Sequence, residues 1–387
     1  MRLLHLITDT PRPSDMLLAW VYDSLAAVSD ARAWTLGPAE LGERFPTFSL
    51  NGDPVAHRHF AAGSGIGRTF TAVLRLRQAA QADRPDVIHA WSLHAAAVAA
   101  AACPETPIVL THSTASDGDG AALPWWMRQT LRGAAPRLTW LGPHLPSDGL
   151  ARLGLSDGRS LRIDPPVNVA RFNEAPQRER QRLSWGVTQP ATRVVVMLSD
   201  QEEHVEAMSA LLGVGLAWET GRDVKVLISP RTGELERALR VMRDVGRIDR
   251  VIIDEAADQP WRLAHAVDAA LVLGDGQSLA WATNAGLPTL VPSLDGVPDG
   301  EAGNADILDA IFARPTSSKP GRIAPHLCRL CDQFDQAERS ASALKAVAQE
   351  VYDVRTYRRR LAGVYQSVAA GERVSWIEPA QGQVVAG

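Results

Sequence analysis

A glycine turn between a predicted strand and a predicted helix is the stretch of this chain best suited to chemistry. Gly274, Asp275 and Gly276 separate a short apolar run, residues 269–273, from a helical pattern at residues 277–285. In this arrangement the backbone N–H groups of the turn and the positive end of the helix dipole point at one spot. The stretch therefore predicts a site for an anionic ligand.

Two side chains in this stretch could add to such a site. Asp275 is the only acid in the turn and could accept hydrogen bonds from ligand hydroxyls, although aspartate is also common in turns because it caps nearby N–H groups. Ser278 could bind an anion through its N–H and hydroxyl, or could cap the helix. The residue types allow both interpretations at each position.

Histidines near the ends of predicted strands are candidates for proton transfer. His112 lies two residues after an apolar run at residues 107–110, where a side chain would lie at the edge of a parallel sheet. His89 and His94 flank another predicted strand end. A lone histidine is more often packed or solvated, and that interpretation is favoured for His89 and His94.

The elements that must position these residues alternate along the chain. Apolar runs predict strands at residues 3–7, 86–90, 107–110, 138–141, 193–198, 224–229, 251–254, 269–273 and 289–291. Helical patterns separate them, for example at residues 16–28, 205–219 and 233–245. Strands that alternate with helices at this spacing indicate parallel βαβ units.

A second glycine-spaced run, residues 63–67, precedes a predicted helix at residues 68–82. Such a run could hold phosphate, but the sequence shows no strand before it. A flexible entry into the helix is the favoured interpretation.

Composition excludes several classes of protein. The chain has 387 residues, enough for two domains, and a net charge of −4, which argues against nucleic-acid binding. Its three cysteines predict no disulfide framework and favour a reducing, cytoplasmic location. No apolar run approaches the roughly 20 residues needed to cross a bilayer.

Two local patterns have a functional and a structural interpretation. Cys328 and Cys331 have metal or redox spacing, but zinc needs four ligands and no second pair exists, so no metal is predicted. Trp125 and Trp126 begin a helix and could contact a sugar or, peripherally, a membrane surface. A membrane contact would need basic residues around them, and packing is the commoner role.

Several motifs together resemble family 4 glycosyltransferases, which have the GT-B fold. The matching residues are Gly274, Gly276, Gly286-Leu287-Pro288, Gly296-Val297-Pro298-Asp299, and the stretches at 86–90 and 161–172. The resemblance implies two Rossmann-like, doubly wound parallel-sheet domains facing across a cleft. We expect the acceptor-side domain at residues 1–175, the donor-side domain at 190–350, and a last helix at 354–370 that crosses back to the first domain.

The resemblance also implies residues that are missing here. The family's two glutamates would fall at Leu273 and Trp281, and its diphosphate-binding arginine and lysine at Met197 and Glu202. The glycine-rich turn after the first strand is replaced by residues 9–14, which contain two prolines and no glycine. Proline has no N–H to donate, so that turn is a poor phosphate cradle.

The resemblance predicts a nucleotide-diphosphate sugar as donor, an acceptor that the sequence does not identify, and no cofactor. The expected donor-binding residues are Gly274, Asp275, Gly276, Ser278, Ser199 and Asp299, with His112 near the reacting sugar. One hypothesis is a retaining glycosyltransferase with an altered donor site. The other is an inactive homologue that serves as a binding or scaffolding partner. A sugar epimerase or binding protein of similar architecture is less favoured.

Overall fold

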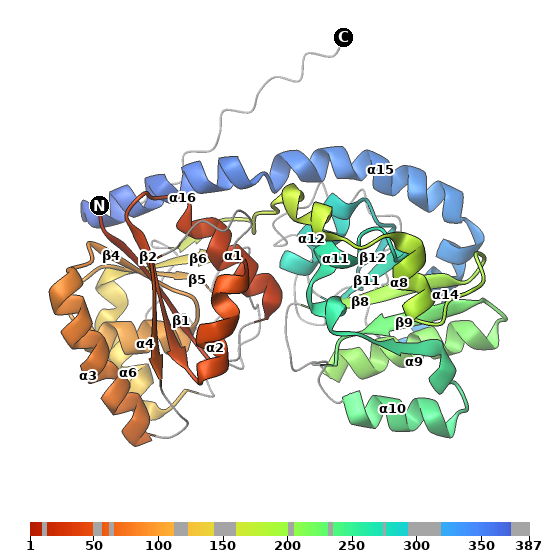
Figure 1. Ribbon diagram of the computed structural model, residues 1–387, viewed down its shortest axis with the longest axis horizontal. Helices are drawn as coiled ribbons and strands as arrows, with labels where there is room; N and C mark the ends of the chain where they lie inside the picture. Colours follow the sequence, from red (N-terminus) through yellow and green to blue (C-terminus); the bar gives the residue numbers. More distant parts are fainter. Residues whose placement is uncertain are drawn as a thin grey trace, which may run out of the picture.

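The computed structural model describes residues 1–9, 14–48, 56–61, 66–111, 123–142, 160–199, 205–230, 235–273, 276–292 and 319–372. Two parallel sheets, each covered by helices, lie side by side, and two long C-terminal helices run along the top of both (Figure 1). This arrangement confirms the predicted class of two α/β domains.

The first sheet has seven parallel strands in the order β3-β2-β1-β4-β5-β6-β7. The strands are β1 (Leu3–Thr8), β2 (Ala31–Gly37), β3 (Ala56–Ala61), β4 (Val87–Ala90), β5 (Ile108–Thr111), β6 (Leu138–Gly142) and β7 (Ser160–Arg162). The inner strands β1, β4 and β5 are fully buried and mostly apolar because helices cover both faces of the sheet.

Helices cover the two faces of this sheet in separate groups. They are α1 (Asp15–Leu25), α2 (Ala39–Arg44), α3 (Ile66–Asp83), α4 (Leu93–Ala102) and α6 (Trp125–Ala134), with short 3₁₀ segments η1 (Phe45–Phe48) and η2 (Ala135–Arg137). Helices α3, α4 and α6 share one hydrophobic core cluster, and α1 belongs to another. Ser14 caps α1 by accepting a hydrogen bond from the Leu17 amide.

The second sheet has five parallel strands in the order β10-β9-β8-β11-β12. Its elements are β8 (Arg193–Ser199), α9 (Val205–Glu219), β9 (Val224–Ile228), α10 (Leu235–Asp244), η5 (Ile248–Arg250), β10 (Val251–Ile253), η6 (Glu255–Asp258), α11 (Pro260–Leu263), β11 (Ala269–Leu273), α12 (Gln277–Ala285), β12 (Thr289–Leu290) and α14 (Pro320–Asp332). Gly286 ends α12 in the left-handed conformation, with φ of 74°.

Two segments connect the halves of the molecule. The first contains η4 (Val169–Glu174) and α8 (Arg178–Ser184), and the second is the pair α15 (Phe334–Val351) and α16 (Val354–Ala369). Helix α15 packs on α12, whereas α16 packs on α1 and β4 (Figure 1). The Tyr357 hydroxyl of α16 accepts a hydrogen bond from Trp20 Nε1 at 2.8 Å, which fixes α16 on α1.

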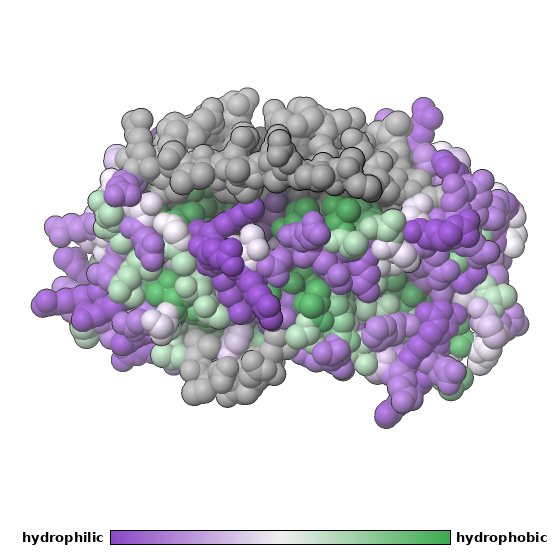
Figure 2. Space-filling view, turned by 90° about the horizontal axis from the view of Figure 1, so that it is seen from above, coloured by the Kyte–Doolittle hydropathy of each residue, from purple (hydrophilic) through white to green (hydrophobic). Residues whose placement is uncertain are grey.

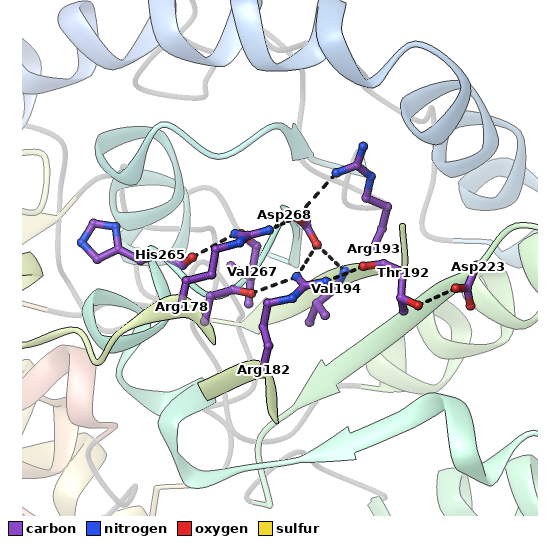
Figure 3. A network of polar contacts seen from close by, with 10 residues as sticks. Arg178, Arg182, Thr192, Arg193, Val194, Asp223, His265, Val267 and Asp268 are labelled. Atoms are coloured by element: carbon purple, nitrogen blue, oxygen red, sulfur yellow. Dashed lines mark hydrogen bonds and ion pairs between the residues drawn. The ribbon is translucent and has the colours of Figure 1, made fainter. Parts of the chain in front are cut away.

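A buried carboxylate fastens α8 to the second sheet. Asp268 accepts hydrogen bonds from Arg178 at 2.5 Å, Arg182 at 2.9 Å and the Val194 amide at 2.7 Å, and Arg193 lies 3.7 Å away (Figure 3). Val194 and Asp268 lie at the amino-terminal edge of β8 and β11. The cluster therefore stabilises the edge of the sheet opposite the glycine turn.

Most predicted elements are confirmed, but strands β2 and β3 of the first sheet were not predicted. A strand, β3, does precede the glycine run at 63–67, so the expectation of no strand there was wrong. The sequence also predicts helices at residues 324–334 and 339–352. The structure has α14 from Pro320, continuing through Pro325, and α15 from Phe334, so both helices begin earlier than predicted. A further helix that the sequence predicts at residues 306–312 lies outside the described residues.

Within the described chain, no helix is both long and apolar enough to span a bilayer. Seen from above, the side along which α15 and α16 run presents hydrophilic residues interrupted by small apolar patches (Figure 2).

Candidate functional site

The carboxyl ends of β8 and β11 lie next to each other, as the donor site predicted from the sequence requires. Ser199, the last residue of β8, is in register with Leu273, the last residue of β11, and Gly276 is the N-cap of α12. Ser199 is partly exposed. Gly274, Asp275, His112 and Asp299 lie outside the described residues, so their predicted roles remain predictions.

The N-terminus of α12 is covered by the N-terminus of α1. Gln277 Nε2 donates a hydrogen bond to the Met16 carbonyl at 3.1 Å, and Ser278 Oγ lies 3.9 Å from Met16 Sδ. Both Gln277 and Ser278 are buried. The helix end at which the sequence predicts an anion is therefore in contact with the other half of the molecule.

The positions where the resemblance places two glutamates are part of the core. Leu273 is 1% exposed and Trp281 is 2% exposed. The Trp281 ring lies 5.1 Å from that of Trp261 and 5.4 Å from that of Phe172, centroid to centroid. A carboxylate at either position would be buried without an evident partner, which proteins avoid.

Met197, at the position of the expected arginine, also points into the core. It lies in the middle of β8, is 7% exposed and belongs to the cluster packed under α9 and α14. The position of the expected lysine, Glu202, lies outside the described residues.

A pocket of about 350 Å³ lies between the two halves, among elements that follow β1, β2 and β10. Its size is within the range of small-molecule sites, roughly 300–1,000 Å³. The lining residues come from both halves of the molecule: Asp15, Arg44, Thr47, Phe48, Pro176, Gln181, Asp254, Glu255, Ala256, Gln259 and Arg262.

A polar bridge joins the two halves at this pocket. Asp15, the first residue of α1, forms an ion pair with Arg44 through one carboxylate oxygen. Its other oxygen accepts a hydrogen bond from Gln259 Nε2 at 2.6 Å. Asp15 is 4% exposed, so this bridge is largely shielded from solvent.

Charges of both signs face the pocket. Asp254 accepts hydrogen bonds from Trp185 Nε1 at 2.6 Å, Gln181 Nε2 at 3.2 Å and the Ala256 amide at 2.8 Å. Glu255 and Arg262 are exposed. The Arg262 guanidinium makes only a long contact of 3.4 Å to Gln259 Oε1 and no ion pair within the described chain. It is thus a cation available to a ligand.

The sequence interpretation missed these pocket residues. One signal could have found them: in open α/β sheets, ligands bind beyond the carboxyl ends of the strands. Asp15 begins the helix after β1, and Asp254 and Glu255 directly follow β10. The arginine and glutamine come from other elements, and no short motif connects them.

Of the two histidines expected to be structural, His89 is buried in the first sheet, and His94 is partly buried on α4. His89 is hydrogen-bonded through both ring nitrogens, to the Tyr365 hydroxyl at 2.6 Å and to Thr111 Oγ1 at 2.7 Å. Its pKa lies well below the usual value, first because of burial and second because of nearby His5. Burial also lowers the pKa of His5 to about 3 and that of His94 to about 4.

No group of three or more possible metal ligands occurs among the described residues. Cys328 and Cys331 are partly buried on α14, and Cys328 Sγ lies 3.3 Å from Thr220 Oγ1. Burial raises the pKa of Cys331 to about 11, so its thiol is protonated at neutral pH.

The chain has the GT-B fold, two facing α/β domains with parallel sheets. A crystal structure of HepE from Anabaena with UDP and glucose matches it with a TM-score of 0.72 at 14% identity, covering 95% of this chain and 100% of HepE. Sucrose-phosphate synthase from Thermosynechococcus elongatus matches with a TM-score of 0.67 at 12% identity, covering 96% and 100%.

A third match extends the fold beyond transferases. The UDP-GlcNAc 2-epimerase from Neisseria meningitidis, bound to UDP-GlcNAc, has a TM-score of 0.60 at 12% identity, covering 96% of this chain and 100% of the epimerase. No protein-family model and no curated protein matches the sequence. At these identities the likeness shows the fold alone.

Proposed function

We propose that this protein binds a nucleotide-diphosphate sugar between its two domains and transfers the sugar to an acceptor. The observation that supports this most directly is the interdomain pocket, which presents Arg44 and Arg262 together with Asp15, Asp254 and Glu255. A nucleotide sugar has groups that can bind both the cations and the carboxylates of this lining. Its diphosphate binds cations, and its hydroxyls donate to carboxylates.

In this proposal the donor site is altered relative to family 4 glycosyltransferases. The cations come from Arg44 and Arg262 instead of the positions of Met197 and Glu202. Gly274, Asp275, Gly276, Ser278, Ser199 and Asp299 line the donor side, and His112 lies near the reacting sugar. The resemblance predicts that the anomeric configuration is retained.

Catalysis requires that the site stabilise the negative charge that develops on the leaving phosphate. Loss of one oriented donor typically costs about 3–4 kcal/mol of barrier, or roughly 100- to 1000-fold in rate. Arg262 is the strongest candidate for this task because it is exposed in the pocket and has no carboxylate partner among the described residues.

Calorimetry with UDP, GDP and ADP, and with their glucose conjugates, tests binding. We expect micromolar affinity for one nucleotide and a loss of about tenfold or more in Arg262→Gln, because a charge-assisted contact contributes about 1.5–3 kcal/mol. Arg240→Gln on α10 is the matched control, since Arg240 is exposed on the same domain outside the pocket. Absence of binding by every nucleotide would falsify the proposal.

A second candidate is an inactive homologue that acts as a binding partner. It is favoured by the burial of Leu273, Trp281 and Met197 and by the contact of Met16 with the start of α12. Nucleotide binding without sugar transfer or donor hydrolysis over long incubation would favour this candidate. Release of the sugar, followed by NMR to determine its anomeric configuration, would favour the enzyme.

A further inference from the structure

Large apolar side chains are exposed on two helices of the first domain. Phe70 is 64% exposed and Leu74 is 45% exposed on α3, and Trp125, the first residue of α6, is 69% exposed. Phe70 and Trp125 are the only phenylalanine and tryptophan side chains exposed within the described chain. Scattered exposed leucines and valines are ordinary, but exposed aromatic residues on the two helices that flank α4 indicate a contact surface.

The two helices form one outer layer. Both pack on α4, and eight of the ten residues of α4 are buried beneath the layer. Alanine dominates α4, so its small side chains let α3 and α6 approach from either side. Figure 1 shows α3, α4 and α6 on the left side of the molecule.

The exposed apolar residues lie at the same end of this layer. Helices α3 and α6 each follow one strand of a parallel sheet and lead into the next, so both run against the strand direction. Their N-termini therefore lie at the carboxyl edge of the first sheet. Phe70 and Leu74 belong to the first half of α3, and Trp125 begins α6.

Positive charge surrounds these residues. Arg75 on α3 and Arg132 on α6 are exposed, Arg128 is partly exposed, and none of the three makes an ion pair with a described residue. Helix α6 contains no acid, and the only acid of α3 is Asp83 at its far end, which is paired with Arg32. This face is basic although the whole chain has a net charge of −4.

We propose that this α3/α6 face, defined by Phe70, Leu74, Trp125, Arg75, Arg128 and Arg132, docks on an anionic lipid bilayer. Aromatic side chains prefer the headgroup region of a membrane, and unpaired arginines are attracted to its negative surface. A second copy of the chain is a poorer occupant, because a two-fold contact would place these arginines against their own copies.

Co-sedimentation with vesicles tests the proposal directly and independently of the proposed donor binding. We expect the full chain to bind vesicles of phosphatidylcholine mixed with phosphatidylglycerol, and to bind phosphatidylcholine alone much more weakly. The double variant Phe70→Ser/Trp125→Ser should bind the mixed vesicles at least about tenfold more weakly. Leu183→Ser/Val245→Ser, at residues 63% and 59% exposed elsewhere, should leave binding unchanged.

Variants that remove arginines test the electrostatic contribution to vesicle binding. Arg128→Gln/Arg132→Gln should lower binding roughly fivefold for each arginine, and added salt should weaken the wild type in the same direction. Arg240→Gln/Arg243→Gln on α10 removes two exposed arginines outside this face and should have little effect. Circular dichroism confirms that each variant is folded.

The proposal is overturned if the wild type does not bind the mixed vesicles, or if the Phe70/Trp125 and Leu183/Val245 variants bind equally. It is also overturned if light scattering shows a dimer that Trp125→Ser dissociates, because the face would then be a protein interface. If the wild type binds vesicles but no nucleotide sugar, only the proposed function is contradicted.

Discussion

The Val167 amide donates a hydrogen bond of 2.8 Å to the Tyr352 carbonyl. This bond joins the two segments that connect the domains, and a single parallel bridge between Val167 and Asp353 continues the pairing. The two connections therefore form one hinge instead of two independent linkers. Any change in the angle between the domains must bend both connections together.

Contacts across the pocket should hold the domains together. Gln259→Glu replaces the donor to Asp15 with a second carboxylate, removing a hydrogen bond to a charged group that contributes about 1.5–3 kcal/mol and adding repulsion. We expect a larger radius of gyration in small-angle X-ray scattering and faster proteolysis near the hinge.

Gln181→Glu is the matched control for this change. Gln181 also donates to an aspartate, Asp254, but Arg178 and Arg182 fasten its helix to the same sheet that Asp254 follows. This variant should lower stability without changing the radius of gyration. Equal scattering from wild type and Gln259→Glu would contradict the bridge.

A glutamate at Trp281, where the resemblance to family 4 glycosyltransferases places one, should not create a site. Trp281→Glu removes the packing against Trp261 and Phe172 and buries a carboxylate. We expect a loss of at least about 3–5 kcal/mol in the free energy of unfolding, the usual range for removing a buried aromatic side chain. Urea denaturation measures it, and Trp281→Phe should lose clearly less. A folded Trp281→Glu protein with wild-type stability would show that the position is not core.

The buried carboxylate of Figure 3 should be essential for the second domain. Asp268→Ala leaves Arg182 without its carboxylate and the Val194 amide without an acceptor. Removing one partner of a buried ion pair costs about 3–5 kcal/mol. Asp249→Ala, at a carboxylate 72% exposed and 3.8 Å from Arg250, should change stability by less than about 0.5 kcal/mol. Similar unfolding midpoints for both variants would contradict this account.

Because His5 is buried, we expect the folded protein to lose stability in acid. Its pKa is about 3 in the folded chain, against about 6.5 when unfolded. Because the folded pKa is lowered, the unfolded state binds more protons between these values, so stability falls as the pH drops below about 6.5. Between pH 7 and pH 5 this one group accounts for a loss of about 2 kcal/mol.

His5→Asn tests that contribution. Asparagine can still accept the hydrogen bond that Trp91 Nε1 donates to His5 Nδ1 at 3.0 Å, but it does not titrate. We expect the variant to be less stable at pH 7 and to lose less of its stability between pH 7 and pH 5. Urea unfolding at the two pH values gives the comparison. The same pH dependence in variant and wild type would assign the acid sensitivity to other groups.

Continuous apolar runs made most of the fold predictable. The helix Gln277–Ala285 was placed correctly because an apolar strand and a glycine turn precede it and Gly286 ends it. Strand β3 was missed because Ala56–Ala61 is a half-exposed edge strand with polar residues. Such strands lack the apolar run that burial on both faces produces.

The candidate site was less predictable because it depends on tertiary contacts. The bridge between Asp15 and Gln259 joins residues more than two hundred positions apart. The sequence showed that Trp281 departs from the family motif, but not that Trp261 and Phe172 enclose it. Linear motifs locate strand ends, whereas the partners that meet there are set by how the domains pack.

Helix α16, near the end of the chain, completes the core of the first domain, so this core can form only late in synthesis. Tyr357 and Tyr365 fill buried positions against Trp20 and His89, which belong to the earliest segments translated. Domains usually fold as they emerge from the ribosome, N-terminal first. The part of the first sheet beside α1 that α16 covers therefore stays exposed until the whole second domain has been made, so chaperones that shield apolar surface would bind this chain early.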